Sequence, residues 1–514
     1  MGRNIILFFY PDAKGQYVIP PYAFLYLERT IRDLPLRVVI LDETRDPDWV
    51  KQVEQLAPEV LLAATSVVLG DQISGAVHFS EKVKQSGDIP VLWGGWFPTW
   101  KPSVCLQEPY IDYVITGQGE SAFSQLVRHI LKHGNDLQSI LKAEIAGFLG
   151  KNNTGAVVRN HQEMQGFKVW PEVDYRLIDI RKYFNVNKTN GNILFRYFAT
   201  AGCPNLCNFC FLSRAWKGQW FAKPIATVIS DIRYFLRVAP EIQYVVFEDN
   251  NFFYDRDYVM AFCKALIKEN IHIRWSASTH IGHFLKTFSD DDLKVIKQSG
   301  CASIASGAES GDQRILDLLN KDLQVDDIIK FVRMVSKHQI TSCFSFMVLF
   351  PGDPERDLQK TLKLVMRLIQ IDPSFQFFLN IYAPTRRNVF LEKAEAYGYR
   401  IPDTMSDFMK FSFDLKHMPW ITPALALRMK VFAHFYFRFF SGAFIFKRAG
   451  MPIRTYMFGL LWWPLIRLRF LFRSTALPVG GRFYNRFILA KPFSSSPGGS
   501  VDKSVLVQYT SIKG

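Results

Sequence analysis

The sequence predicts an α/β protein with two successive series of alternating strands and helices, followed by a mainly helical region. Short apolar runs alternate with amphipathic stretches in residues 1–150 and again in residues 191–385. Short buried strands alternating with helices are typical of parallel βαβ units. Residues 151–190 are irregular and look like a connector, and residues 386–514 form the helical region.

Residues 1–150 predict a doubly wound, Rossmann-like domain. Ligands of such sheets bind at the carboxyl ends of the strands. Glycines at these ends let the backbone approach a bulky ligand, although each of them could also serve only a tight turn. Three such turns on one edge favour a cofactor. The expected strands are 5–10, 37–42, 60–66, 90–95 and 113–117, and the edge carries Thr65, Ser66, Gly94, Gly95, Gly117 and Glu120.

Residues 191–385 contain six strand–helix units, which fit a partial (β/α)6 barrel. Functional residues of a full barrel lie at the carboxyl ends of its strands, and we expect the same here. The expected strands are 193–200, 244–249, 271–278, 301–307, 341–350 and 375–382. The expected helices are 225–238, 256–268, 290–299, 312–319, 325–338 and 355–371.

Three of the seven cysteines, Cys203, Cys207 and Cys210, lie in one short stretch, CPNLCNFC, directly after the first barrel strand. Clustered thiolates can converge on one metal centre. A structural zinc site usually has four ligands, and the loop supplies three. Three thiolates on a [4Fe–4S] cluster leave one iron open, which favours a catalytic cluster. A zinc knuckle with a remote ligand and a chance cluster are the alternatives.

The motif C-x3-C-x2-C after the first strand resembles that of the radical S-adenosylmethionine (SAM) superfamily. The resemblance implies that the three cysteines hold a [4Fe–4S] cluster and that SAM chelates its fourth iron. It also implies contacts to SAM from Phe209, Glu248, Asp249 and Glu309. The stretch SFMVLFPGD is similar to a further family motif, in which a glycine commonly stands near Leu349.

The stretches VLLAATSVV, PVLWGGWFPTWKP and IDYVITGQGESAF resemble the cobalamin-binding domain of cobalamin-dependent radical SAM enzymes. The last usually contains GEGE, and here Gln118 replaces the first glutamate. The motif D-x-H-x-x-G, which supplies a histidine to cobalt, is absent, and we expect His78 to be a helix residue. The resemblance implies cobalamin without a protein histidine below cobalt, which suits methyl transfer.

The formal net charge is +15, yet the stretch from Leu415 to Val501 contains thirteen Lys or Arg and no Asp or Glu. The longest uncharged run there has twelve residues (455–466), and a membrane-spanning helix needs about twenty. A basic, aromatic pattern suits a helix in the membrane interface, and we expect surface contact through 424–490. An extra helical layer on the barrel is the alternative. Such apolar runs do not suit a nucleic-acid groove.

We therefore expect an enzyme that cleaves SAM and methylates an unactivated carbon of a small-molecule or lipid-like substrate. A radical oxidative cyclase or rearrangement enzyme acting on a membrane-associated tetrapyrrole or lipid is the alternative. A membrane-bound cobalamin or iron–sulfur carrier is the non-enzymatic alternative. The resemblance implies an electron donor such as flavodoxin or ferredoxin. The few, clustered cysteines favour a reducing compartment, so we expect a cytoplasmic protein, peripheral on the inner face of the cytoplasmic membrane.

Overall fold

The chain folds into two units. The first comprises residues 1–196, 221–242 and 402–411, and the second comprises 197–220, 243–401 and 412–514. The predicted connector therefore belongs to the first unit, while the predicted domain limits remain predictions. The computed structural model describes residues 3–12, 18–151, 157–160, 172–186, 192–211, 216, 218–385, 388–411, 418–432 and 453–472.

The first unit contains a seven-stranded sheet in the order β2-β1-β3-β4-β5-β6-β7. Its first five strands pair in parallel, as the sequence predicts. Strands β6 and β7 add an antiparallel edge that the sequence analysis missed, because FLGK and VVR are too short to show a period. The strands are β1 Ile5–Tyr10, β2 Arg37–Asp42, β3 Val60–Ser66, β4 Val91–Gly94, β5 Tyr113–Ile115, β6 Phe148–Lys151 and β7 Val157–Arg159.

Strand β1 shows why this sheet needs helices on both faces. Successive side chains of a strand point to opposite faces. Phe8 stacks on Phe24 at 4.7 Å between ring centroids, whereas Phe9 stacks on Phe79 at 4.4 Å. Phe8 and Phe9 are fully buried. Burial of each side chain contributes about 1.5–3 kcal/mol to the free energy of folding. The helices are α1 Tyr22–Arg29, α2 Trp49–Leu56, α3 Asp71–Ser86, α4 Trp96–Trp100, α5 Pro102–Gln107, α6 Glu120–His133 and α7 Leu137–Lys142.

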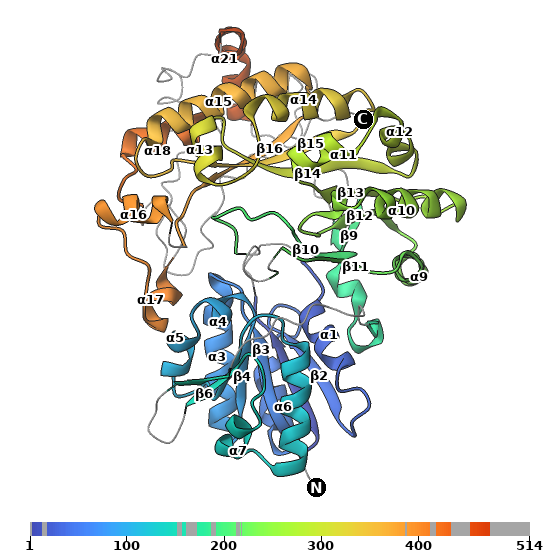
Figure 1. The fold of residues 1–514 in the computed structure, drawn as a ribbon, viewed down its shortest axis with the longest axis vertical. Coiled ribbons are helices and arrows are strands. Elements are labelled where there is room, and N and C mark those ends of the chain that lie inside the picture. The colour runs from blue at the N-terminus through green and yellow to red at the C-terminus, as the bar shows by residue number, and fades with distance from the viewer. Residues whose placement is uncertain are drawn as a thin grey trace. The chain divides into compact units, whose positions relative to one another are not determined.

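A second seven-stranded sheet has the order β16-β15-β14-β13-β12-β9-β8. The pairs from β12 to β16 are parallel, in agreement with a partial barrel (Figure 1). The strands are β8 Asn185–Val186, β9 Ile193–Tyr197, β12 Ile242–Phe247, β13 Arg274–Ser278, β14 Cys301–Glu309, β15 Thr341–Val348 and β16 Gln376–Ile381. A separate two-stranded sheet pairs β10 Thr200–Gly202 with β11 Trp220–Ala222.

The barrel strands bury one face fully and the other in part. In β15, Phe344, Phe346 and Val348 are buried, while Ser345 and Met347 between them are half-buried. This period of two indicates that helices cover one face only, and Figure 1 shows α14 and α15 over the sheet. The helices are α9 Ile225–Val238, α10 Arg256–Lys268, α11 Ile281–Thr287, α12 Asp290–Gln298, α13 Gln313–Leu318, α14 Val325–Ser336 and α15 Pro354–Ile371.

The C-terminal region is helical where the structure describes it. Its helices are α16 Val389–Ala396, α17 Met405–Lys410, α18 Pro423–Val431 and α21 Ile453–Leu471. Much of the predicted membrane segment 424–490 lies outside the described residues. None of the helices in the described ranges is long and apolar enough to cross a membrane.

Candidate functional site

The cysteine loop begins where strand β10 ends, and Asp249 holds the backbone that leads into it. The Asp249 carboxylate accepts hydrogen bonds from the backbone N–H groups of Ala199 and Thr200, at 2.9 and 2.5 Å. Asp249 itself lies just beyond β12 and is buried. One oxygen of this predicted SAM contact is therefore committed to positioning the loop. The neighbouring Glu248 is half-buried, and its backbone N–H donates to Tyr197 O at 2.9 Å.

The cysteine loop is also anchored to the turn that follows α13. The Asn208 N–H donates to Leu319 O at 3.0 Å, and the Asn320 amide donates to Leu206 O at 3.1 Å. These two hydrogen bonds join segments more than one hundred residues apart. They bring the turn, and the residue after Asn320, next to the cysteines.

The three loop thiols differ in exposure. Cys207 is buried, while Cys203 and Cys210 are half-buried, and all seven cysteines of the chain are outside disulfides. Burial raises the pKa of Cys207 to about 11, with Cys210 and Cys203 adding to the shift. The thiols are therefore close enough to interact electrostatically. No group of three or more His, Cys, Asp or Glu side chains within the described ranges is spaced to hold a metal ion, so the ligand assignment remains a prediction.

A buried ion pair lies beside the cysteine loop. Lys321 Nζ is 2.8 Å from Glu309 Oε1, and both residues are less than 10% exposed. Burial alone would lower the pKa of Lys321, but Glu309 and Cys207 outweigh burial and the pKa is raised. Lys321 therefore keeps its positive charge between a carboxylate and the loop thiols. Glu309 ends β14 with φ of +60°, a conformation that non-glycine residues rarely adopt.

Phe209 connects this ion pair to an apolar cluster. Its ring lies 5.8 Å from Lys321 Nζ, in the range of a cation–π contact. The structure thus brings together Phe209 and Glu309, two predicted SAM contacts, with Cys207 and a lysine that the sequence analysis did not select. The cluster that packs against Phe209 consists of Ile315, Leu319, Phe350, Tyr382 and Phe390.

In the first unit, the strand ends of the parallel sheet are tied together by Thr99 of α4. The Thr99 hydroxyl donates to Gly95 O at 2.6 Å and accepts from Gly117 N at 2.9 Å. Gly95 has φ of +96°, and a Cβ there would lie 2.8 Å from Val67 O. The predicted residues Ser66 and Gly94 thus end β3 and β4, and Gly95 and Gly117 lie just beyond β4 and β5 at the same edge. At Gly95 the neighbouring backbone leaves no room for a side chain.

Two predicted cobalamin contacts at this edge behave differently. The Thr65 hydroxyl is buried and donates to Phe9 O at 3.0 Å, so its hydrogen bond serves the sheet. Burial raises the pKa of Glu120 to about 7, and Gln118 hydrogen-bonds to its carboxylate. Glu120 Oε2 and Gln118 Oε1 are buried and find no hydrogen-bond partner in the described part of the chain. Buried polar atoms without partners are costly, so these two oxygens favour a ligand with N–H or O–H groups.

Comparison with known families matches two parts of the chain to two different family models. Residues 12–127 match the B12 binding domain, and residues 197–365 match the radical SAM superfamily. The chain contains a radical SAM domain and a B12-binding domain. Its cofactors are accordingly a [4Fe–4S] cluster, SAM and cobalamin.

Known proteins resemble this chain over most of its length, at low sequence identity. An uncharacterized methyltransferase of Pyrococcus horikoshii is 26% identical over 357 residues, covering 68% of this chain and 73% of the relative. An anaerobic magnesium-protoporphyrin IX monomethyl ester cyclase of Synechocystis is 23% identical over 417 residues, with 78% of each chain covered. The radical SAM methyltransferase TsrM of Kitasatospora setae, solved with cobalamin and a [4Fe–4S] cluster, shares the fold with a TM-score of 0.59 and 17% identity, covering 81% of this chain and 83% of TsrM.

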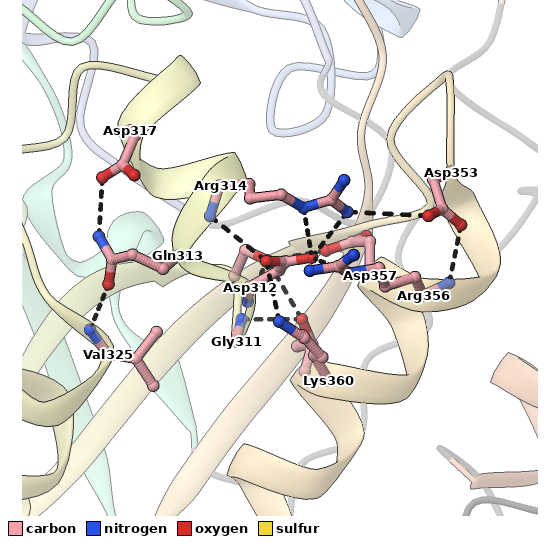
Figure 2. A network of polar contacts seen from close by, with 12 residues as sticks. Gly311, Asp312, Gln313, Arg314, Asp317, Val325, Asp353, Arg356, Asp357 and Lys360 are labelled. Atoms are coloured by element: carbon pink, nitrogen blue, oxygen red, sulfur yellow. Dashed lines mark hydrogen bonds and ion pairs between the residues drawn. The ribbon is translucent and has the colours of Figure 1, made fainter.

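A polar network in the radical SAM domain fixes the loop after Glu309 (Figure 2). Asp312 is fully buried and accepts from Arg314, Arg356 and Lys360 at 2.9, 3.1 and 3.3 Å. Burial opposes ionisation of Asp312, but its hydrogen bonds from Arg314 and Lys360 keep its pKa below the usual range. Because α15 supplies two of the three cations, the network ties the β14 loop to that helix.

Leu349 explains one departure from the family pattern in the radical SAM domain. It has φ of +66°, where a glycine would be unstrained. Two hydrogen bonds hold it there: Leu349 N donates to Asp357 at 2.7 Å, and Leu349 O accepts from the buried Trp420 indole at 2.7 Å. The backbone conformation that suits glycine is thus retained with a leucine, and a residue of the C-terminal region supports it.

Two histidines after β13 have structural partners in this domain. His280 Nε2 donates to Lys321 O at 2.7 Å, and its Nδ1 accepts from His283 N at 3.3 Å, which caps α11. Burial, then Lys321, lowers the pKa of His280 to about 4. His283 Nε2 lies 2.7 Å from Tyr254 O. His280 is therefore neutral and holds the Lys321 backbone in place, while His78 is an exposed residue of α3, as expected.

The sequence analysis missed two residues that organise these sites. Lys321 lies in LLNKDLQ, where a lone lysine carries no periodic signal of burial. Thr99 lies in WFPTW, and only the folded sheet shows that its hydroxyl joins two strand ends. Both act through contacts to residues distant in sequence, which spacing alone does not reveal.

Proposed function

We propose that this chain is a cobalamin-dependent radical SAM methyltransferase that methylates an unactivated carbon of a small-molecule or lipid-like substrate. The observation that carries the proposal is the presence, in one chain, of the C-x3-C-x2-C loop on a radical SAM domain and of a B12-binding domain. When bound, the cluster and SAM supply radical removal of a substrate hydrogen, and cobalamin supplies methyl transfer.

Cys203, Cys207 and Cys210 would supply three thiolates, and the Lys321 cation beside Cys207 would favour their ionised form. Phe209 offers an aromatic face and Glu309 a carboxylate next to the same loop.

In the first unit, the partnerless oxygens of Gln118 and Glu120 would accept hydrogen bonds from the amide groups on the periphery of cobalamin. Ser66 at the end of β3 and the glycines at the ends of β4 and β5 would let the macrocycle approach the backbone.

The names of the relatives favour two activities. The Pyrococcus relative is named a methyltransferase and the solved neighbour TsrM is one, which supports methyl transfer. The Synechocystis relative is named a cyclase, so oxidative cyclisation without net methyl transfer is the second candidate.

SAM labelled on its methyl carbon separates the two activities. The chain is purified anaerobically, loaded with cobalamin and reduced by a flavodoxin or ferredoxin system. It is then incubated with an extract from cells in which Cys207→Ala replaces the wild-type protein. We expect 5′-deoxyadenosine and a small molecule that carries the label. Label-free product with 5′-deoxyadenosine would favour cyclisation, and product formation undiminished without cobalamin would refute the proposal.

Cysteine variants test whether the loop initiates the reaction. Cys207→Ala should abolish 5′-deoxyadenosine formation, because it removes one of three expected cluster ligands. Cys343→Ala is the matched control, since Cys343 lies on β15 outside the loop and should retain activity. A carrier without catalysis would instead keep its cellular function in the Cys207→Ala strain.

A further inference from the structure

Helix α21, Ile453–Leu471, presents a continuous apolar stripe to solvent. Leu461 is 76% exposed and Phe472, directly after the helix, is 74% exposed. Scattered exposed apolar residues need no explanation, but a contiguous set of large ones indicates an interaction surface. The stripe consists of Met457, Leu461, Leu465, Leu468 and Phe472.

The spacing of these residues places them on one side of the helix. At about 100° per residue, positions separated by four, four, three and four residues fall within an arc of ~80°. Ile466, about 100° from Leu465 on the far side of the stripe, is fully buried. The helix therefore packs through the Ile466 side and leaves the opposite side uncovered within the described part of the chain.

The positive charge around α21 indicates which kind of partner contacts the stripe. The helix contains three arginines and no acidic residue, and the surrounding stretch from Leu415 to Val501 has thirteen basic residues and no acidic one. Arg467 is exposed, with its guanidinium 5.4 Å from the Trp463 ring centre. A second copy of the chain would present the same positive charge, which opposes self-association through this face. An anionic lipid surface offers an apolar acyl region for the stripe and negative headgroups for the basic residues.

We propose that α21 lies in the interface of an anionic membrane, with the Met457–Phe472 stripe in the acyl region and Arg467 at the headgroups. The helix carries Pro464 and three arginines, and basic residues beside large exposed apolar side chains are typical of helices in the plane of the interface. The proposal is independent of the reaction that the radical SAM domain catalyses.

Flotation of the full-length holoenzyme with lipid vesicles tests this. We expect binding to vesicles that contain phosphatidylglycerol and much weaker binding to pure phosphatidylcholine. The double variant Leu461→Ser and Phe472→Ser should lower the partition constant roughly 100-fold, about tenfold for each side chain. Arg467→Gln should lower it about fivefold at low salt and less at high salt. Leu131→Ser is the matched control, because Leu131 is an exposed leucine of α6 and its loss should not change binding.

Folding and oligomeric state are measured on the same samples. Cluster absorbance and circular dichroism should match the wild type, so that a loss of binding reflects the surface. Absence of wild-type binding to anionic vesicles, or unchanged binding by the double variant, would overturn the proposal. A wild-type dimer in light scattering that the double variant dissociates would also overturn it, in favour of a second copy as the occupant.

Discussion

Breaking the buried Glu309–Lys321 pair should destabilise the radical SAM domain strongly. Lys321→Met keeps much of the side-chain volume but leaves the Glu309 carboxylate buried without its cation at 2.8 Å. Removing one partner of a buried pair costs about 3–5 kcal/mol, because the remaining charge is no longer compensated. Glu309→Gln should cost a similar amount, since it leaves Lys321 buried.

The double variant decides whether the two residues act as a pair. Neutral partners leave no uncompensated charge, so the loss in the double variant should fall short of the summed single losses by about 1–3 kcal/mol. The free energy of unfolding is measured anaerobically by denaturant titration with circular dichroism. Lys330→Met is the control, because its ion pair with Asp327 is exposed and should matter by at most about 0.5 kcal/mol. Additive single effects, within about 0.5 kcal/mol, would refute the reasoning.

Three further predictions concern stability. The pKa of His280 is lowered to about 4, so the stability that neutral His280 contributes is complete above the usual histidine pKa and is lost as pH falls. Relative to His280→Asn, the unfolding free energy of the wild type should fall by about 2 kcal/mol between pH 8 and pH 5. Parallel curves of unfolding free energy against pH for the two proteins would contradict this. Trp420→Phe removes the indole hydrogen bond to Leu349 O and should lower the unfolding free energy by about 1–2 kcal/mol in denaturant titrations. Gly95→Ala should lower the unfolding free energy more than Gly134→Ala and weaken cobalamin retention on gel filtration, because a Cβ at Gly95 meets backbone atoms whereas the space at Gly134 is open. Equal losses of unfolding free energy in the two variants would contradict this, because both glycines have positive φ.

Much of the fold could be predicted because its signals are local. The helices at 225–238 and 256–268 and the strands at 5–10, 37–42 and 60–66 have the bounds expected from the sequence. Their apolar periods match their secondary structure. The antiparallel β6–β7 edge could not be predicted, because such short strands are defined by pairing with a neighbour and not by a period of their own.

The candidate site divides in the same way. Short motifs in the sequence contain Cys203, Cys207, Cys210, Phe209 and Glu309. The chemistry of their thiol, aromatic and carboxylate groups follows from the residue types alone. Their arrangement depends on contacts between segments far apart in the chain, such as Asn320 to Leu206. The same holds for Asp249, whose carboxylate holds the backbone ahead of the cysteine loop.

The sequence by itself determined the two α/β units, the cofactor class and the basic character of the C-terminal region, because these follow from local periods, motif spacing and composition. Only the tertiary structure decided that Lys321 lies buried between Glu309 and the cysteine loop, that His280 is a neutral support, and that one side of α21 stays uncovered. Burial and pairing are properties of the folded environment, and a residue type alone does not specify which neighbours will surround it.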